Sequence, residues 1–298
     1  MKFTKLFIFL LVSVTQLSYP IPQYYCTSAD KEHFELLLNL IGSIHKTNFG
    51  NLQEIAVFDL GFTKKQCKLL QTINKVQVYN LEKTNPQMFE RMLTGPTRKV
   101  RGCFTWKPVA IKQGLELFPY MLYLDAGISV LQPLDTLFEH IENKGYFLVD
   151  CGHDIACRLT KNVLHNIINE QFSEHKHHLL SPNALSISAG MQGLSRKVYD
   201  DYVLPIYQLS SNISIFEDDG SSPLGLGAAR HDQPLYSIYA NIQNFDISLQ
   251  GWIPLESKNN PLDPIHVHWD SQALLPETSI FISQNGMRYK FKDFIKFK

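Results

Sequence analysis

Three apolar segments alternate with two amphipathic ones between residues 23 and 79, and this alternation constrains the fold more than any other feature of the chain. Gln23–Thr27, Glu54–Asp59 and Val76–Tyr79 are typical of strands, whereas His33–Ile44 and Thr63–Thr72 have the apolar spacing of helices with one buried face. A strand–helix–strand–helix–strand order with short connections returns each strand in the same direction. The sequence therefore predicts an α/β fold with a mostly parallel sheet flanked by helices.

Two polar segments follow strands where α/β folds bind their ligands. Thr27-Ser28-Ala29-Asp30 ends the first strand. Asp125-Ala126-Gly127 follows the apolar strand Met121–Leu124, which comes after a helix expected from Trp106 to about Leu117. Because ligands gather beyond the carboxyl ends of strands in open sheets, both segments belong to a candidate site.

The second half of the chain is less regular. The sequence predicts a strand over Tyr146–Val149, a strand or turn over Ser186–Gly193, helices over Val198–Leu209, Gln233–Asn241 and Met287–Lys298, a mobile loop over Asp218–Gly227 and a solvated loop over Glu174–His178. With 298 residues, 44% of them hydrophobic, the chain can bury one large core, so a single domain is the economical interpretation. The 28 basic and 28 acidic residues balance, which argues against nucleic acid as a partner and makes any phosphate site local.

The N-terminus carries a targeting pattern. Two lysines precede an apolar run from Leu6 to Val14, as in a secretory signal peptide, and the run is shorter than the ~20 residues of a membrane span. We expect residues 1–18 to be a signal peptide or short membrane anchor, and residues 19–298 to be the working domain. The expected location is the secretory pathway, meaning the Golgi or endoplasmic reticulum lumen of a eukaryote or the periplasm or envelope of a bacterium. Any membrane contact would come through an uncleaved N-terminal segment.

The five cysteines are an odd number and match no zinc spacing. An exported protein could form one or two disulfides from them, and free buried thiols are an equal alternative.

Asp125 is the first candidate for chemistry. A carboxylate projected from the end of a buried strand, next to Gly127, can hold a hard divalent cation that bridges phosphate oxygens. An aspartate that only caps the loop is the alternative.

The segment Arg230-His231-Asp232-Gln233 is the second candidate. It lies between a glycine-rich loop and an expected helix, where an acid and an amide could be presented to a sugar. Asp232 could equally be an ordinary helix N-cap, with its two predecessors solvated.

The third candidate is the late run from Ile265 to Asp270. Alternation places His266 and His268 on one face of a strand, where the imidazoles could share a metal or divide between metal and phosphate. A half-exposed pair on a strand is the alternative.

Taken in order, these segments resemble GT-A glycosyltransferases, and in particular the glycogenin-like and lipopolysaccharide galactosyltransferase-like enzymes, over roughly residues 24 to 270. The segments that carry the resemblance are Thr27-Ser28-Ala29-Asp30, Trp106-Lys107-Pro108, Tyr123-Leu124-Asp125-Ala126-Gly127, Ser188-Ala189-Gly190-Met191-Gln192-Gly193, Arg230-His231-Asp232-Gln233 and His266-Val267-His268.

The resemblance implies a Rossmann-like nucleotide-binding half at about residues 23–130 and an acceptor-side half at about 131–298. It assigns residues to four parts of the site. The donor-binding residues would be Thr27, Ser28 and Asp30 near the base and ribose, then Asp125, Ala126 and Gly127, and finally Lys107 or Arg101 at the diphosphate. The catalytic pair would be Asp232 and Gln233, and the metal would be bound by Asp125 and His268. On the side of the acceptor and sugar would lie Gly190, Arg230 and His231.

The implied reaction is hexosyl transfer from a nucleotide-diphosphate sugar, expected to be UDP-linked, to a glycan, lipid or protein. Mn²⁺ or Mg²⁺ would assist the leaving diphosphate, and the anomeric configuration would be retained. Gly127 departs from the family, whose acidic motif has a second aspartate at this position. A non-catalytic carbohydrate-binding protein on the same scaffold is therefore an alternative, and a glycoside hydrolase using Asp125 and Asp232 is a third.

Overall fold

The strand–helix alternation predicted for the N-terminal part is confirmed by the computed structural model, which describes residues 21–94, 98–249, 251–255, 265–269, 276–282 and 290–298. Strands β1 (Gln23–Ala29), β2 (Leu52–Asp59) and β3 (Val76–Asn80) pair in parallel. Helices α1 (Phe34–Asn48) and α2 (Lys64–Thr72) connect them. Thr63 begins α2 with a capping box, as its side chain accepts the Gln66 backbone N–H.

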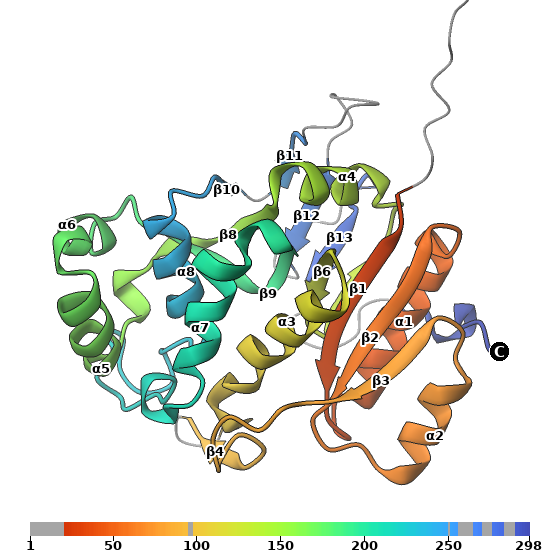
Figure 1. The fold of residues 1–298 in the computed structure, drawn as a ribbon, viewed down its shortest axis with the longest axis horizontal. Coiled ribbons are helices and arrows are strands. Elements are labelled where there is room, and N and C mark those ends of the chain that lie inside the picture. The colour runs from red at the N-terminus through yellow and green to blue at the C-terminus, as the bar shows by residue number, and fades with distance from the viewer. Residues whose placement is uncertain (1–20, 95–97, 250, 256–264, 270–275, 283–289) are drawn as a thin grey trace, which may run out of the picture.

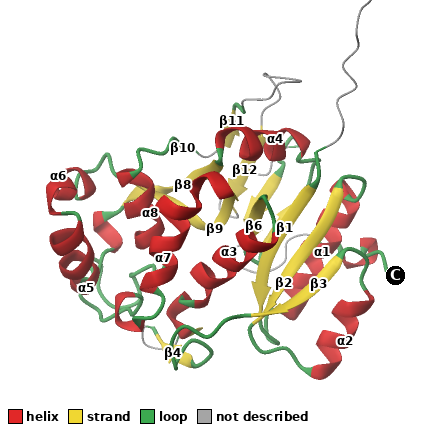
Figure 2. Cartoon of the chain, viewed as in Figure 1, coloured by secondary structure: helices red, strands yellow, loops and turns green. Residues whose placement is uncertain are grey.

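Seven strands form the central sheet, in the order β10-β8-β9-β6-β1-β2-β3 (Figures 1 and 2). The strands not yet given are β6 (Tyr120–Leu124), β8 (Tyr146–Asp154), β9 (Leu185–Ser195) and β10 (Ile247–Ser248). β6 pairs with β1 in parallel, and β9 runs antiparallel to both of its neighbours. The predicted mixed, mostly parallel sheet is thus confirmed.

A smaller sheet and a hairpin complete the strands. The four-stranded sheet has the order β11-β12-β13-β7, and β4 pairs with β5. Their bounds are β4 (Arg91–Leu93), β5 (Lys99–Arg101), β7 (Ile128–Val130), β11 (Gly251–Ile253), β12 (Ile265–Trp269) and β13 (Ile280–Ile282). β7 starts directly after Gly127, so the second sheet is joined to the candidate site.

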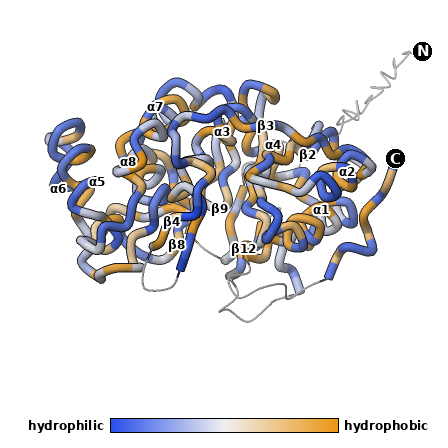
Figure 3. Tube along the Cα trace, turned by 90° about the horizontal axis from the view of Figure 1, so that it is seen from below, coloured by the Kyte–Doolittle hydropathy of each residue, from blue (hydrophilic) through white to orange (hydrophobic). Residues whose placement is uncertain are grey.

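Helices cover both faces of the central sheet. The remaining helices are α3 (Trp106–Leu117), α4 (Asp135–Lys144), α5 (Lys161–Val163), α6 (Lys176–Leu179), α7 (Leu204–Leu209) and α8 (Gln233–Ile242). Successive residues of β1 enter different cores: Tyr25 packs with residues of α1, α4 and the small sheet, and Cys26 packs with residues of α3 and α8. The helical traces carry hydrophobic and hydrophilic residues in alternation, as expected for helices with one buried side (Figure 3).

Three expectations about local structure in the second half of the chain need correction or refinement. The helix predicted over Val198–Leu209 is helical but composite, with a 3₁₀ turn, a π-helical stretch over Tyr199–Val203 and then α7. The alternative of a turn over Ser186–Gly193 is excluded, because these residues lie inside the long strand β9. Glu174–His178 is largely exposed as predicted, but it forms helical turns and no loop.

The predicted terminal helix is wrong where it can be compared. Residues 287–289 lie outside the described part, and the rest contains only a 3₁₀ turn over Lys292–Phe294. The reason is packing: Phe297 forms a β-bridge with Ile73, and the Phe291 carbonyl lies so close to Gly42 of α1 that a Cβ there would be 2.1 Å from it. The chain end is used as an extended strap over α1 and α2.

All five cysteines are free, which answers the disulfide question in favour of thiols. The predicted leader and Asp270 lie outside the described residues. Within the described residues, no helix has the length and apolar character needed to cross a membrane.

Candidate functional site

The candidate site lies where the chain reverses its direction of travel across the sheet. From β1 the chain moves outward through β2 and β3, whereas β6 pairs on the other side of β1. This switch point leaves a crevice at the carboxyl ends of β1 and β6. A cavity of about 260 Å³ lies there, and it is lined by Ser28 and Asp30 from one strand end and by Asp125, Ala126 and Gly127 from the other.

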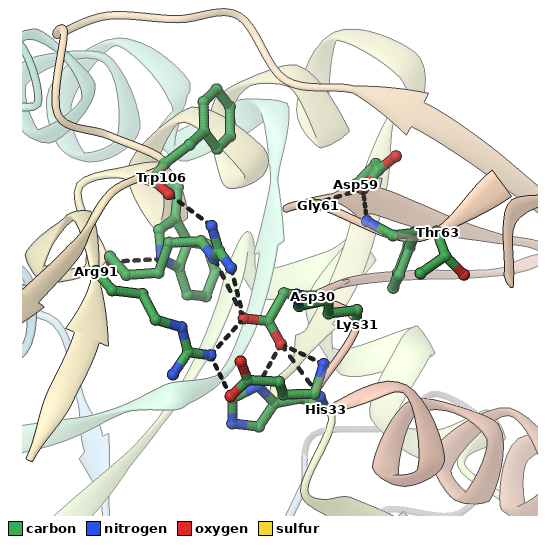
Figure 4. Close-up of polar contacts among 12 residues, drawn as sticks. Asp30, Lys31, His33, Asp59, Gly61, Thr63, Arg91 and Trp106 are labelled. Atoms are coloured by element: carbon green, nitrogen blue, oxygen red, sulfur yellow. Dashed lines mark hydrogen bonds and ion pairs between the residues drawn. The ribbon is translucent and has the colours of Figure 1, made fainter.

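Asp30 is the centre of a dense polar network on the cavity wall (Figure 4). Its Oδ1 accepts the backbone N–H groups of Glu32 at 3.0 Å and His33 at 3.1 Å, and lies 2.7 Å from the His33 ring. Its Oδ2 accepts from Arg91 at 3.0 Å and from Arg101 at 3.0 and 3.2 Å. Burial raises the pKa of Asp30, but the hydrogen bonds from His33 and Arg101 outweigh it and hold this pKa far below its usual range.

Both oxygens of Asp30 are therefore engaged by the protein itself. The network fastens the β4–β5 hairpin, which carries both arginines, to the end of β1. Arg101 is further committed through its Nη1, which donates to the Phe89 carbonyl. The hydroxyls of Thr27 and Ser28, which were predicted near the base and ribose, are both buried, and neither has a hydrogen-bond partner among the described residues. Of the two residues, Ser28 lines the cavity. Ser28 is consequently the better placed of the two to meet a ligand.

Lys107 joins two candidate carboxylates. It projects from α3, is 2% exposed, and its Nζ lies 3.1 Å from Asp125 Oδ2 and 3.3 Å from Asp232 Oδ2. The Nζ also reaches the Ala189 carbonyl at 3.4 Å. Burial lowers the pKa of Lys107, but the two carboxylates raise it by more, so the amine stays charged. The lysine predicted to reach the diphosphate instead lies between the carboxylates.

Asp232 is at the N-cap position of α8, but its side chain makes no capping hydrogen bond. The alternative of an ordinary cap is thus excluded, and the carboxylate is directed to Lys107. Burial, aided by the charge of Asp125 and opposed by Lys107, raises the pKa of Asp232 to about 6. The next residue, Gln233, uses its amide nitrogen on the Cys151 thiol at 2.6 Å and the Ile187 carbonyl at 2.9 Å.

Asp125 is held from two further sides. The Tyr123 hydroxyl donates to its Oδ1 at 2.9 Å, and its backbone N–H donates to the Gly190 carbonyl at 2.8 Å. A Cβ on Gly190 would lie 2.7 Å from Asp125 Oδ2, so any side chain at this position would displace the carboxylate. The predicted association of Gly190 with the site is therefore a direct contact with Asp125.

His231 and Arg230 come just before Asp232 in the chain, and neither is among the described residues that line the cavity. His231 has a φ of +54°, is buried, and its Nδ1 lies 2.7 Å from the Phe216 carbonyl. Its ring is 5.4 Å from that of Phe104, which lines the cavity. Arg230 is exposed.

His268 lies on β12 and is only 7% exposed, yet neither of its ring nitrogens has a hydrogen-bond partner in the part of the chain that the structure describes. Its ring faces that of His266 at 6.3 Å, which confirms that the two imidazoles share one face. Burial, and next the charge of His266, lowers the pKa of His268 and favours the neutral form that binds metals. β13 separates β12 from β7, so His268 is two strands from the segment that follows Gly127. Within the described ranges, no group of three or more metal-binding side chains occurs.

The hairpin residues Arg91, Arg98 and Lys99 also line the cavity and were not singled out from the sequence. The signal available was the clustering of Arg98, Lys99 and Arg101 within four positions, just before the helix that begins at Trp106.

No family model matches the chain, and no curated protein matches it. Among solved structures, the galactosyltransferase LgtC in complex with donor and acceptor sugar analogues has 10% sequence identity and a TM-score of 0.48, over 88% of this chain and 87% of that one. Mouse xyloside xylosyltransferase 1 has 9% identity and a TM-score of 0.47, over 89% and 98% of the chains. Core-mannan synthase A from Aspergillus fumigatus, in its Mn/GDP form, has 11% identity and a TM-score of 0.46, over 76% and 72%.

These neighbours are all glycosyltransferases, which is the class that the sequence motifs resemble. At such identities and TM-scores, what this chain does has to be inferred from its own residues.

Proposed function

We propose that the protein is a glycosyltransferase that moves a hexosyl group from a nucleotide-diphosphate sugar, UDP-linked in our expectation, to a hydroxyl of a glycan, lipid or protein acceptor. The observation that carries the proposal is the cavity itself. It connects the unpartnered Ser28 hydroxyl to the Asp125 carboxylate and is edged by the cationic residues Arg98 and Lys99. A polar pocket for the nucleoside, positive charge for a diphosphate and a carboxylate for the reacting end are what this donor requires.

The reaction breaks the bond between the anomeric carbon and the diphosphate oxygen, and forms a bond from that carbon to the acceptor oxygen. The proton of the acceptor hydroxyl passes to the oxygen of the leaving diphosphate. The leaving diphosphate gains negative charge, and Arg98 and Lys99 are placed to oppose it. Asp232 is the buried carboxylate that would stabilise positive charge at the anomeric centre. Retention of configuration is part of the proposal, and NMR of the fresh product tests it, since an inverted anomer would refute it.

Binding of a divalent cation is part of the proposal. Asp125 has a side chain that is 38% exposed, and His268 has two buried nitrogens without a hydrogen-bond partner among the described residues. These two residues would hold Mn²⁺ or Mg²⁺, which would supply Lewis-acid stabilisation of the leaving diphosphate. Since Gly127 provides no second carboxylate, we expect the affinity for metal to be lower than with an Asp-x-Asp pair.

The first experiment is a melting-temperature screen of residues 19–298 against nucleoside diphosphates and their sugars, with and without Mn²⁺. Ligands that bind only the folded protein raise its melting temperature by mass action. We expect one nucleotide to raise it, Mn²⁺ to increase the effect, and Asp125→Asn and His268→Gln to remove the increment due to Mn²⁺. Nucleotide binding without any effect of Mn²⁺ would eliminate the metal assignment alone.

A non-catalytic carbohydrate-binding protein is the second candidate, favoured by the Lys107 ammonium, which already occupies Asp125 Oδ2 at 3.1 Å. Such a protein would respond to free glycans and to no nucleotide.

Secretion is a separate part of the proposal. Expression of the full chain with a C-terminal tag, followed by N-terminal sequencing of the exported product, tests cleavage near Ser18.

A further inference from the structure

A tryptophan and a phenylalanine line the cavity, and the tryptophan is committed to the fold. Trp106 is 6% exposed, and its indole Nε1–H donates to the Arg101 carbonyl at 3.1 Å. Phe104 lines the same cavity and is only half-buried. Of these two rings, Phe104 therefore offers the larger apolar surface to a ligand in the cavity.

The backbone that carries Phe104 is strained. Gly102, Cys103 and Phe104 have φ angles of +48°, +47° and +65°, so three successive residues adopt left-handed conformations. Two of them carry side chains, and the left-handed region is unfavourable for such residues because Cβ approaches the following carbonyl oxygen. Conformations of this kind persist only where the surroundings hold them, and they cluster at functional sites.

Contacts on both sides hold this turn in place. The Gly102 backbone N–H donates to the Glu90 carbonyl at 2.8 Å. The Gly102 carbonyl accepts the Thr105 backbone N–H at 2.9 Å and the Thr105 hydroxyl at 2.8 Å. A Cβ on Gly102 would lie 2.1 Å from the Met88 carbonyl oxygen. The surrounding residues thus fix the turn, and the turn fixes the direction in which the Phe104 side chain leaves the backbone.

The Phe104 ring lies at the end of the cavity where the carboxylates meet. Its centroid is 5.4 Å from Lys107 Nζ, which is the atom that contacts both Asp125 and Asp232. The His231 ring, from the residue just before Asp232, lies 5.4 Å from the Phe104 ring. A ligand group that touches Phe104 in the cavity is therefore close to the groups assigned to the reaction.

The part of a glycosyl donor expected at this end is its sugar. A hexopyranose ring presents C–H groups on its faces, whereas its hydroxyls project mostly from its edge. The face of an aromatic ring is the negative side of its quadrupole and attracts the partly positive C–H hydrogens. Contact also removes apolar surface of both rings from water. The sugar hydroxyls stay free to hydrogen-bond with polar groups such as Asp125.

We propose that Phe104 is a specificity-determining residue whose ring stacks on the hexopyranosyl unit of the donor. This inference rests on the proposed function and names the residue that recognises the transferred sugar. Because the contact is with the sugar, it adds to the affinity for a nucleotide sugar and leaves the affinity for the free nucleotide unchanged.

The test measures what the sugar contributes to binding. Titration calorimetry gives the affinities of UDP, UDP-glucose, UDP-galactose, GDP and GDP-mannose for the intact protein and for the variants Phe104→Leu and Phe104→Tyr. Leucine keeps an apolar side chain without a ring, whereas tyrosine keeps the ring. Phe172→Leu is the matched control: Phe172 is also half-buried and packs edge-on against Tyr239, but it is not among the described residues that line the cavity.

We expect Phe104→Leu to weaken binding of the preferred nucleotide sugar by about threefold to tenfold, the range of one aromatic contact. The affinity for the corresponding free nucleotide should stay the same. Phe104→Tyr and Phe172→Leu should both bind the nucleotide sugar as the intact protein does.

An unchanged affinity for the nucleotide sugar in folded Phe104→Leu overturns the inference and leaves the proposed function standing. An equal loss for nucleotide and nucleotide sugar also overturns it, because the ring would then serve the nucleoside. The same holds if Phe104→Tyr loses as much affinity as Phe104→Leu. Absence of binding by UDP, by GDP and by their sugars to the intact protein instead overturns the proposed function.

A second measurement applies if the melting temperature shows that Phe104→Leu does not fold. In protein labelled with para-fluorophenylalanine, the fluorine resonance of Phe104 is identified by its disappearance in Phe104→Tyr. We expect the nucleotide sugar to shift this resonance and the free nucleotide to leave it almost unchanged. A resonance that responds equally to both ligands, or to neither, overturns the inference.

Discussion

Replacement of Lys107 by methionine tests whether the buried ammonium group offsets the free-energy cost of placing two carboxylates at the base of the cavity. Methionine keeps most of the side-chain length and removes the charge. In the variant, Asp232 loses the cation 3.3 Å away and remains 4% exposed in the low-dielectric interior. We expect the folded state to lose stability for this reason alone.

The magnitude follows from the burial of each carboxylate. Removing one partner from a buried ion pair typically costs about 3–5 kcal/mol, and Asp232 falls in that class. Asp125 adds little, since its side chain is 38% exposed and water screens its charge. The total expected loss is therefore about 3–5 kcal/mol in the free energy of unfolding.

The loss should depend on pH in a defined direction. The pKa of Asp232 is already raised to about 6 in the folded protein, above its unfolded value, so the folded state binds the proton more tightly. Loss of Lys107 raises this pKa further, so the penalty is present at neutral pH and shrinks as the pH falls and Asp232 becomes protonated. Urea denaturation at pH 7.5 and at pH 5 measures both values.

The double variant Lys107→Met/Asp232→Asn provides the control. It removes both charges, and we expect it to recover most of the lost stability. A loss below about 1 kcal/mol for Lys107→Met, or a loss that Asp232→Asn does not reduce, would contradict the assignment of the ammonium as the counter-charge of Asp232.

Three further substitutions probe single contacts. Asp30→Asn should cost about 2–4 kcal/mol in the free energy of unfolding, because it leaves two guanidinium groups without their shared carboxylate. The pKa of Asp30 is depressed in the folded state, so its contribution to stability is present above about pH 4 and is lost in acid. Denaturation followed over the acid range should therefore show a stability that varies less with pH in the variant than in the intact protein. Gly190→Ala should displace the Asp125 carboxylate, which a Cβ would approach to 2.7 Å, and abolish transfer with only a small loss of melting temperature. Gly42→Ala should cost about 1–3 kcal/mol by pushing away the C-terminal strap, whereas Gly50→Ala, with no atom within 4 Å of its Cβ, should leave stability almost unchanged.

The sheet could be predicted from sequence because its signals are local. The apolar run Met121–Leu124, which lies within β6, and the periodicity of α1 each depend on residues that are neighbours in the chain. The structure of the chain end could not be predicted in this way. Phe291 contacts α1 and Phe297 pairs with Ile73, and both partners lie more than 200 positions earlier in the chain.

Two of the predicted aspartates, Asp30 and Asp125, line the cavity, but their connections to other side chains were not predicted. Asp30, Asp125 and Asp232 were singled out by their positions at the ends of strands and at the start of a helix. The protein engages both oxygens of Asp30 because the β4–β5 hairpin folds back onto β1. No local sequence pattern predicts this contact. For the same reason Lys107 was expected at a ligand and was found between two side chains.

The charge around Lys107 bears on what the base of the cavity can bind. Lys107 is enclosed by two carboxylates, so its neighbourhood is already anionic and suits a cation or the positive charge that develops on a sugar.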